Sequence, residues 1–193
     1  MSLITSFSRP TPLRLYGDPI ASDYLSGAKT HGFAGYGNVT IINGQIHYSP
    51  IYIAKRTHVV ALAIAVSVQS GTGGAKARLA LFTAVASTGA PGSLIVDAGE
   101  VAIDSTGLKD SSAIDQWIDG DTWVYRAINA SHTGASLSGF TSGPVLSKNL
   151  APASTPPWSL SETFAYAAMP LSATIPGGAS GGNIRTVMLK VAP

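Results

Sequence analysis

The sequence predicts an all-β fold, an antiparallel β-sandwich or jelly roll with an extended N-terminal arm. Short apolar runs, many of them β-branched, recur between residues 51 and 128 with Gly, Pro, Asp and Ser between them, which is the pattern of a sandwich. No stretch keeps the period of about 3.6 residues that marks an amphipathic helix. A chain of 193 residues has room for one well-buried core but is short for two. We therefore expect an arm over residues 1–37 and one sandwich domain over residues 38–193.

The arm contains Pro10, Pro12 and Pro19 and a glycine-rich stretch at residues 32–37. No periodic pattern survives so many glycines, so this part is predicted to be extended. We expect the arm to contact either the sandwich or neighbouring subunits. Both a docking peptide and a plain connector fit the sequence, because N-terminal arms serve both uses.

Asn43-Gly44 is the clearest local signal, since this dipeptide suits a two-residue hairpin turn in which both central residues have positive φ. It stands between two strand-like runs, residues 38–42 and 45–48. The pattern predicts a β-hairpin here. Ser49-Pro50 is expected to end its second strand, because proline cannot donate a hydrogen bond to a ladder.

The rest of the domain is predicted to be strands and loops. Leu108 to Ile118 has room for at most a turn or two of helix, and Ser131 to Ser159 is rich in Ser, Gly, Thr and Pro, which predicts a long surface loop of the kind where binding often resides. The expected strands are residues 58–68, 77–84, 94–97, 100–104, 122–128, 161–167 and 185–191, with turns at 71–74 and a Pro-Gly loop at 90–93.

The composition is apolar and poor in charge. Hydrophobic residues make up 45% and charged residues 11% of the chain, against about 25% charged in typical soluble domains. Such a surface is covered by small polar residues or by other protein chains. The net charge is +2 with no basic cluster larger than Lys55-Arg56, which argues against a nucleic-acid partner.

Targeting and membrane signals are also weak. The N-terminus has no basic region followed by a sustained apolar segment, so we expect no signal peptide. The longest apolar run, near Val59 to Val68, is shorter than the about 20 residues that a membrane helix needs. We expect a protein that is soluble when made and does not insert into a membrane.

Metal and cofactor sites are not predicted. The chain has no cysteine, which removes thiolate nucleophiles and cysteine-ligated metals. The four histidines have no metal-ligand spacing, and His47 and His58 are expected on solvent-facing strand positions. Gly27-Ala28-Lys29-Thr30 lacks the glycine spacing of a phosphate-binding loop. Asp119-Gly120-Asp121 could supply oxygens to calcium, but the pair Asp-Gly more often forms a tight turn.

The residues do not point to an enzyme. A glycosidase needs two carboxylates across a cleft. Asp97, Glu100 and Asp104 are the candidates for this pair, yet nothing in their spacing assigns an acid and a base. No Gly-x-Ser-x-Gly motif accompanies the many serines. We therefore predict no catalytic residue and no cofactor.

The remaining candidates for a binding site are aromatic side chains, because flat rings can stack on sugars: Trp117, Trp123, Tyr125, Phe140 and Trp158. Trp123 and Tyr125 share one side of a predicted strand, and packing in the core is the favoured interpretation for them. Phe140 and Trp158 lie in the predicted long loop. These two residues are our sequence-based candidates for contacts with a glycan.

The central segment resembles a module of bacteriophage structural proteins. The resemblance is carried by Ser49 to Ile53, Thr57 to Val68 and Gly73 to Phe82, by the Pro-Gly loop and strands from Gly89 to Val101, and by Gly120 to Tyr125. Together these cover roughly Tyr48 to Ile128. The pattern is similar to the jelly-roll module of tail-fibre, head-fibre and decoration proteins.

The resemblance implies a non-enzymatic structural protein of the virion, displayed on the particle surface and acting in assembly and host attachment. Other virion proteins, of the capsid or the tail, would be its partners, and a homotrimer is the expected oligomer. A glycan-binding receptor tip of a tail fibre is the alternative, and a glycan-cleaving enzyme is a third reading. The chain is short and lacks a fibre shaft, which favours a compact head decoration or spike. The sequence does not decide between head and tail.

Overall fold

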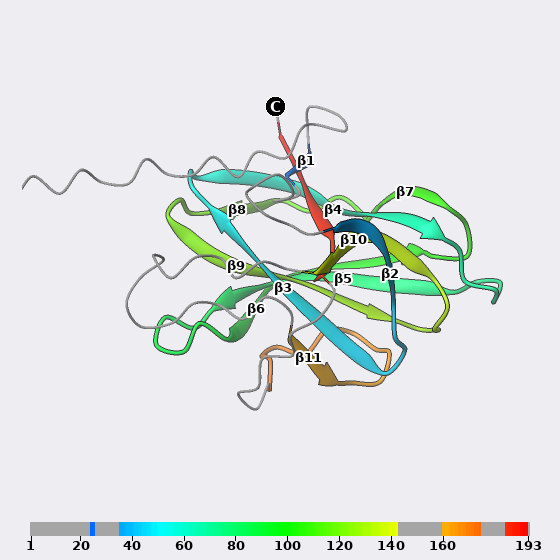
Figure 1. The fold of residues 1–193 in the computed structure, drawn as a ribbon. Helices are drawn as coiled ribbons and strands as arrows, with labels where there is room; N and C mark the ends of the chain where they lie inside the picture. The colour runs from blue at the N-terminus through cyan, green and yellow to red at the C-terminus, as the bar shows by residue number, and fades with distance from the viewer. Residues whose placement is uncertain (1–23, 26–34, 143–159, 175–183, 193) are drawn as a thin grey trace, which may run out of the picture.

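The chain folds into two antiparallel sheets, which confirms the predicted all-β sandwich (Figure 1). The computed structural model describes residues 24–25, 35–142, 160–174 and 184–192. Every regular element in these residues is a strand, and they include no helix that could span a membrane. Most of the predicted arm lies outside them.

Sheet B has five strands in the order β11-β3-β9-β5-β6. Its centre is an unbroken pairing of β3 and β9, from Ile46 opposite Asn129 to Ile53 opposite Thr122. The strands are β3 (Gln45–Ile53), β5 (Lys76–Ala84), β6 (Pro91–Ala102), β9 (Thr122–Ala130) and β11 (Leu160–Thr163).

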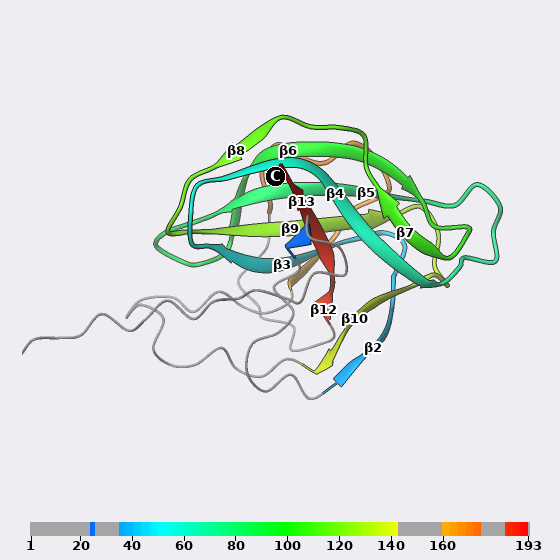
Figure 2. The same ribbon diagram turned by 90° about the horizontal axis from the view of Figure 1, so that it is seen from above.

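Sheet A has eight strands built around β4 (Thr57–Val68). β13 (Val187–Val191) and β10 (Ser136–Ser142) pair with one side of β4, and β7 (Gly107–Asp110) and β8 (Gln116–Ile118) pair with the other. The remaining strands extend the sheet beyond β13 and β10, as Figure 2 shows for β2 beside β10. They are β1 (Tyr24–Leu25), β2 (Gly35–Thr40) and β12 (Ile184–Arg185).

The main core lies between the two sheets. Alternate residues of each strand point into it, as a pleated strand requires; β4 contributes Leu62 and Ile64, and β5 contributes Leu79 and Leu81. All four side chains are completely buried. The apolar run at residues 58–68 is therefore one long strand that forms the centre of sheet A.

A second apolar cluster lies on the opposite, outer face of sheet B. Tyr48, Phe82 and Tyr125 form its centre, with the rings of Tyr48 and Phe82 5.2 Å apart and edge to face. The chain after β11 covers it, and Met169 is buried there. The Tyr125 hydroxyl donates a hydrogen bond to the Gly89 carbonyl. Sheet B is therefore buried on both faces.

The predicted hairpin at Asn43-Gly44 is wrong. β2 pairs with β10 in sheet A, whereas β3 pairs with β9 and β11 in sheet B. Gly44 has φ of 76°, but Asn43 is not among the described residues with positive φ, so the two-residue turn that pairs neighbouring strands does not form. The chain turns from one sheet to the other instead. β2 also crosses the predicted boundary between arm and domain at residue 38.

Three further boundaries differ from the prediction. Pro50 lies inside β3, where β11 no longer pairs beyond Leu160 opposite Tyr48, so its missing N–H removes no bond from that ladder. β6 begins at Pro91 and continues to Ala102 as one strand with bulges. Residues 108–118 hold β7 and β8 in place of any helical turn.

The predicted loop at residues 131–159 contains β10 in its first half, and residues 143–159 lie outside the described part of the chain. β10 binds β2 and β4 into the same sheet. At Gly139 it approaches β12 closely, since a Cβ there would lie 2.3 Å from the Ile184 carbonyl oxygen. This close approach requires glycine.

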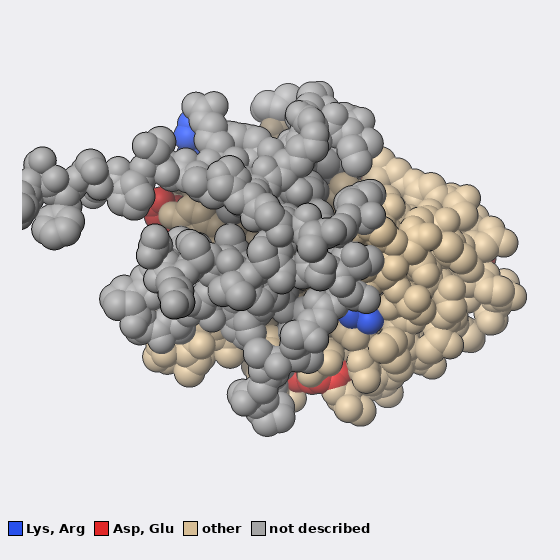
Figure 3. All heavy atoms as spheres, viewed as in Figure 1, with Lys and Arg blue, Asp and Glu red and all other residues tan. Residues whose placement is uncertain are grey.

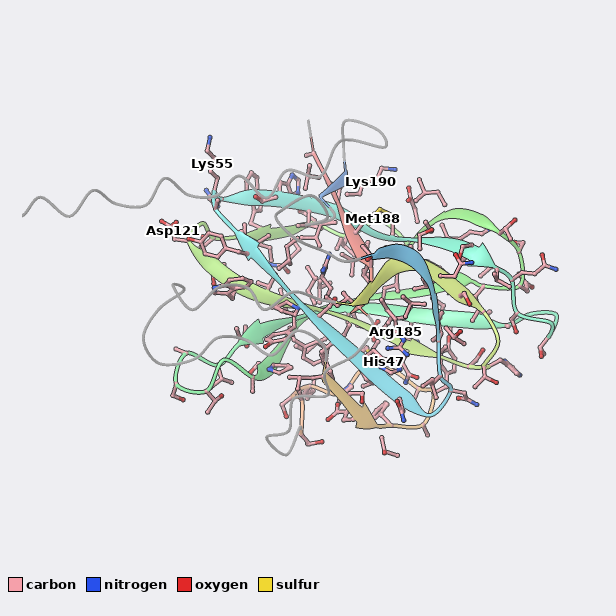
Figure 4. All side chains as sticks on the ribbon, in the orientation of Figure 1. His47, Lys55, Asp121, Arg185, Met188 and Lys190 are labelled. Carbon is pink, nitrogen blue, oxygen red and sulfur yellow. The ribbon has the colours of Figure 1, made fainter. Side chains whose placement is uncertain are left out.

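His47 was expected to face solvent, and this is also wrong. Its side chain is buried on the inner side of β3 with Ser49, and Figure 4 shows it beside Arg185 of β12. Burial, together with the charge of Arg185, lowers the pKa of His47 to about 3. A histidine kept neutral in this way makes folding dependent on pH.

We predict that Gly139→Ala destabilises the fold by about 1–3 kcal/mol, because the added methyl group overlaps a backbone oxygen that cannot move freely. Gly71→Ala is the matched control, since nothing lies within 4 Å of a Cβ at that position. Urea unfolding of both variants measures the difference. Equal stability of the two would contradict the close packing of β10 against β12.

We predict that His47 makes the protein less stable in mild acid. Below about pH 6.5 the unfolded histidine binds a proton while the folded one does not until pH falls to about 3, so the free energy of unfolding decreases by about 1 kcal/mol per pH unit as pH falls through this window. Urea unfolding between pH 4 and 6 gives the slope. A His47→Gln variant should show a shallower slope, and an unchanged slope would rule out this role of His47.

Candidate functional site

An exposed aromatic cluster stands at the edge of sheet A. Trp117 lies on β8 directly opposite His58 of β4, and the two rings are parallel, 4.5 Å apart with an angle of 6° between their planes. The guanidinium carbon of Arg56 is 4.5 Å from the centre of the indole, which is cation–π distance. Even so, Trp117 remains 50% exposed.

Asp115 fixes the histidine of this cluster. Its Oδ1 is 2.6 Å from His58 Nε2, and the side chain of Asp115 is 85% exposed whereas that of His58 is 27% exposed. A carboxylate bonded to one ring nitrogen sets the orientation of the imidazole. We call Arg56, His58, Asp115 and Trp117 together the Trp117 platform.

A second aromatic pair lies at the same end of the sandwich on sheet B. Tyr52 and Trp123 are opposite each other on β3 and β9, with ring centres 5.3 Å apart. The Tyr52 hydroxyl donates to Asp121 Oδ1 at 2.9 Å, and burial and this hydrogen bond raise the pKa of Tyr52. Lys55 and Asp121 mark this end of the molecule in Figure 4.

The Asp119-Gly120-Asp121 stretch connects β8 in sheet A to β9 in sheet B through a bend. Asp121 has φ of 55°, a left-handed conformation that aspartate tolerates. A Cβ on Gly120 would lie 3.0 Å from the Lys55 Cα, so glycine lets the two connections pack together. In the residues that the structure describes, no three His, Asp or Glu side chains gather in a way that could hold a metal ion.

Asp97 and Glu100 come together on the outer face of sheet B, around Arg78. A bulge in β6 places Asp97 opposite Ala80 and Glu100 opposite Arg78, so both carboxylates reach the same guanidinium. Arg78 Nε is 2.8 Å from Asp97 Oδ2, and Arg78 Nη1 is 3.7 Å from Glu100 Oε1.

Asp97 and Glu100 accept hydrogen bonds from neighbouring segments and so hold these segments against sheet B. Asp97 accepts hydrogen bonds from the backbone N–H groups of Gly99 and Met169, both at 3.0 Å. Glu100 accepts from Lys76 Nζ at 2.9 Å and from the Tyr166 hydroxyl at 2.8 Å. These hydrogen bonds lower the pKa of Glu100. Asp104, the third candidate, accepts from the Gly74 N–H at 2.8 Å.

The two predicted glycan-contacting residues are not brought together by described contacts. Phe140 belongs to β10, where its backbone pairs with Tyr36 and Ile184, so it is on a strand and not in the predicted loop. Trp158 lies outside the described residues. Their role as sugar contacts remains a prediction.

Sequence reasoning did not single out the Trp117 platform. Trp117 was only one of several aromatic candidates, and its partners Arg56 and His58 are about sixty positions away in the chain. Strand alternation continued back from β4 by one residue could have placed Arg56 and His58 on one side of the chain. No pattern in the sequence indicated that β4 pairs with the three-residue strand β8, which carries Trp117.

The uncharged surface expected from the composition is visible on the face in Figure 3, where charged side chains of the described residues are isolated spots among uncharged atoms. Comparisons of the chain with protein-family models, with curated proteins and with solved structures gave no match.

We predict that Asp97→Ala loosens the segment after β11. The variant loses the acceptor for Arg78 and for the Met169 N–H, and leaves both partly buried donors without that bond, so we expect a loss of about 1–3 kcal/mol of stability. Chymotrypsin should then cut faster after Phe164 and Tyr166. Asp119→Ala is the control, because Asp119 is exposed and its replacement should change stability by less than about 0.5 kcal/mol. Equal cutting rates in the two variants would contradict the fastening role.

Proposed function

We propose that this chain is a non-enzymatic structural protein of a bacteriophage virion, displayed on the particle surface as a head decoration, spike or fibre-type module. It would act in assembly and host attachment, as a homotrimer in contact with capsid or tail proteins. The observation that carries the proposal is the resemblance over residues 48–128. In the structure this stretch supplies most of β3 and all strands from β4 to β8, together with most of β9.

The surface chemistry supports an assembled protein. Only 11% of the residues are charged, and the described charged side chains include ion pairs within the fold, such as Arg78–Asp97 and Lys190–Asp110. A chain with so few charged residues has little electrostatic repulsion to keep solitary molecules apart in solution. Such a surface suits a protein that packs beside other copies in a particle.

The geometry of the carboxylates favours binding over hydrolysis. A glycosidase keeps one of its two carboxyl groups protonated by raising its pKa. Here the pKa of Glu100 is lowered by its hydrogen bonds, and Asp97 is occupied by Arg78 and two backbone donors. Neither residue is poised to act as a general acid.

A glycan-binding receptor tip is the second candidate, and one observation favours it. Trp117 is large and apolar, yet 50% exposed, and an exposed flat ring offers a surface on which a sugar can stack. The candidates Phe140 and Trp158 would extend this role to the segment from β10 onward.

Mass spectrometry of gradient-purified virus particles, produced by cells that carry this gene, tests the proposed function. We expect the chain in stoichiometric amounts in intact particles. Labelled antibodies viewed by electron microscopy would then assign it to head or tail. Intact, infectious particles that lack the chain would refute the proposal.

A further inference from the structure

We propose that the Trp117 platform is a saccharide-binding site, in which the solvent-exposed part of the indole stacks on the apolar face of a pyranose ring. This inference does not depend on a place in a virion. The site consists of residues of this chain alone. The saccharide proposal and the virion proposal can therefore be refuted separately.

Half of the Trp117 surface is exposed to solvent. The two groups that contact Trp117, the His58 ring and the Arg56 guanidinium, come from β4 and the residue just before it. β8 pairs with β4, and it has no other paired neighbour among the described strands. The side of Trp117 that faces away from β4 therefore has no described strand beside it, in agreement with its 50% exposure.

The platform is organised before any ligand arrives. His58 supports the indole from the β4 side, and Asp115 holds His58 through the 2.6 Å contact with Nε2. Fixing a long side chain on binding costs affinity, and a ring that is already held avoids this cost. The arrangement suits a rigid, flat contact surface.

The polar groups around the indole match the chemistry of sugar hydroxyls. Arg56 carries only hydrogen-bond donors, and the carboxylate of Asp115 is an acceptor that is 85% exposed. A hydroxyl can both donate and accept, so it satisfies either group. Because these two groups carry opposite charges, together they do not select a strongly charged ligand. A neutral polyol with one apolar face, a pyranose, meets these conditions.

The platform by itself offers less apolar area than a stable protein interface needs. A stable protein interface buries about 800 Å² on each side, whereas the platform offers one indole. Leu108 of β7 is also apolar and exposed and lies on the same sheet edge. It is opposite Ala65 of β4, whereas Trp117 is opposite His58. Seven residues along β4 separate them by about 20 Å, so they do not form one patch.

The test is binding of the full recombinant chain to an array of bacterial surface polysaccharides and their pyranose oligosaccharides. The wild-type chain should bind at least one saccharide. Trp117→Ala should weaken that binding about tenfold or more, since the stacking contact is lost. Trp117→Tyr should retain part of it. Leu108→Ala is the matched control, an exposed apolar residue on the same edge, and should bind like the wild type.

Circular dichroism checks that each variant is folded. If Trp117→Ala does not fold, the saccharide affinity of Trp117→Tyr still tests the proposal. Three results would overturn the proposal. The first is a wild-type chain that binds no saccharide on the array. The second is equal affinity of the wild type and both Trp117 variants. The third is a Trp117→Ala chain of lower oligomeric mass by sedimentation, which would make this edge a contact between copies.

Discussion

Sheet B carries large apolar side chains on both faces, and the rest of the structure depends on covering both. The inner face packs against sheet A through residues such as Leu79 and Leu81. The outer face carries Tyr48, Phe82 and Tyr125, which would be too costly to leave in water, at about 1.5–3 kcal/mol for each large side chain. The chain after β11 has to lie over this face.

Polar contacts hold that covering chain in place. The N–H of Phe164 donates to the Gly44 carbonyl, and that of Ala173 donates to the Gly92 carbonyl. Buried Glu162 accepts from the Tyr48 hydroxyl at 2.5 Å and from the Thr174 N–H at 2.9 Å. The hydroxyl of a core tyrosine is thereby satisfied, as buried polar groups require. Glu162, like Asp97 and Glu100, thus holds the chain after β11 against the outer face of sheet B.

The sequence predicted the fold class and many of the strands, because alternation and turn residues are local signals. β4 and β9 were expected from their own residues. The hairpin predicted at Asn43-Gly44 was wrong because turn preference is a local property. The strand β2 pairs instead with β10, about a hundred residues later in the chain. The solvent-facing position predicted for His47 was wrong for a similar reason, since strand alternation does not show which face of a strand other residues cover. The second core and the Trp117 platform arise from distant pairing, which no short pattern records.

Amide hydrogen exchange followed by NMR tests the two-faced burial of sheet B most directly. If the chain after β11 covers the outer face, the amide protons of Phe164, Met169 and Ala173 will be protected together with those of β5 and β9. Exchange of these three amides at the rate of an unstructured peptide, while β5 and β9 remain protected, would contradict the account.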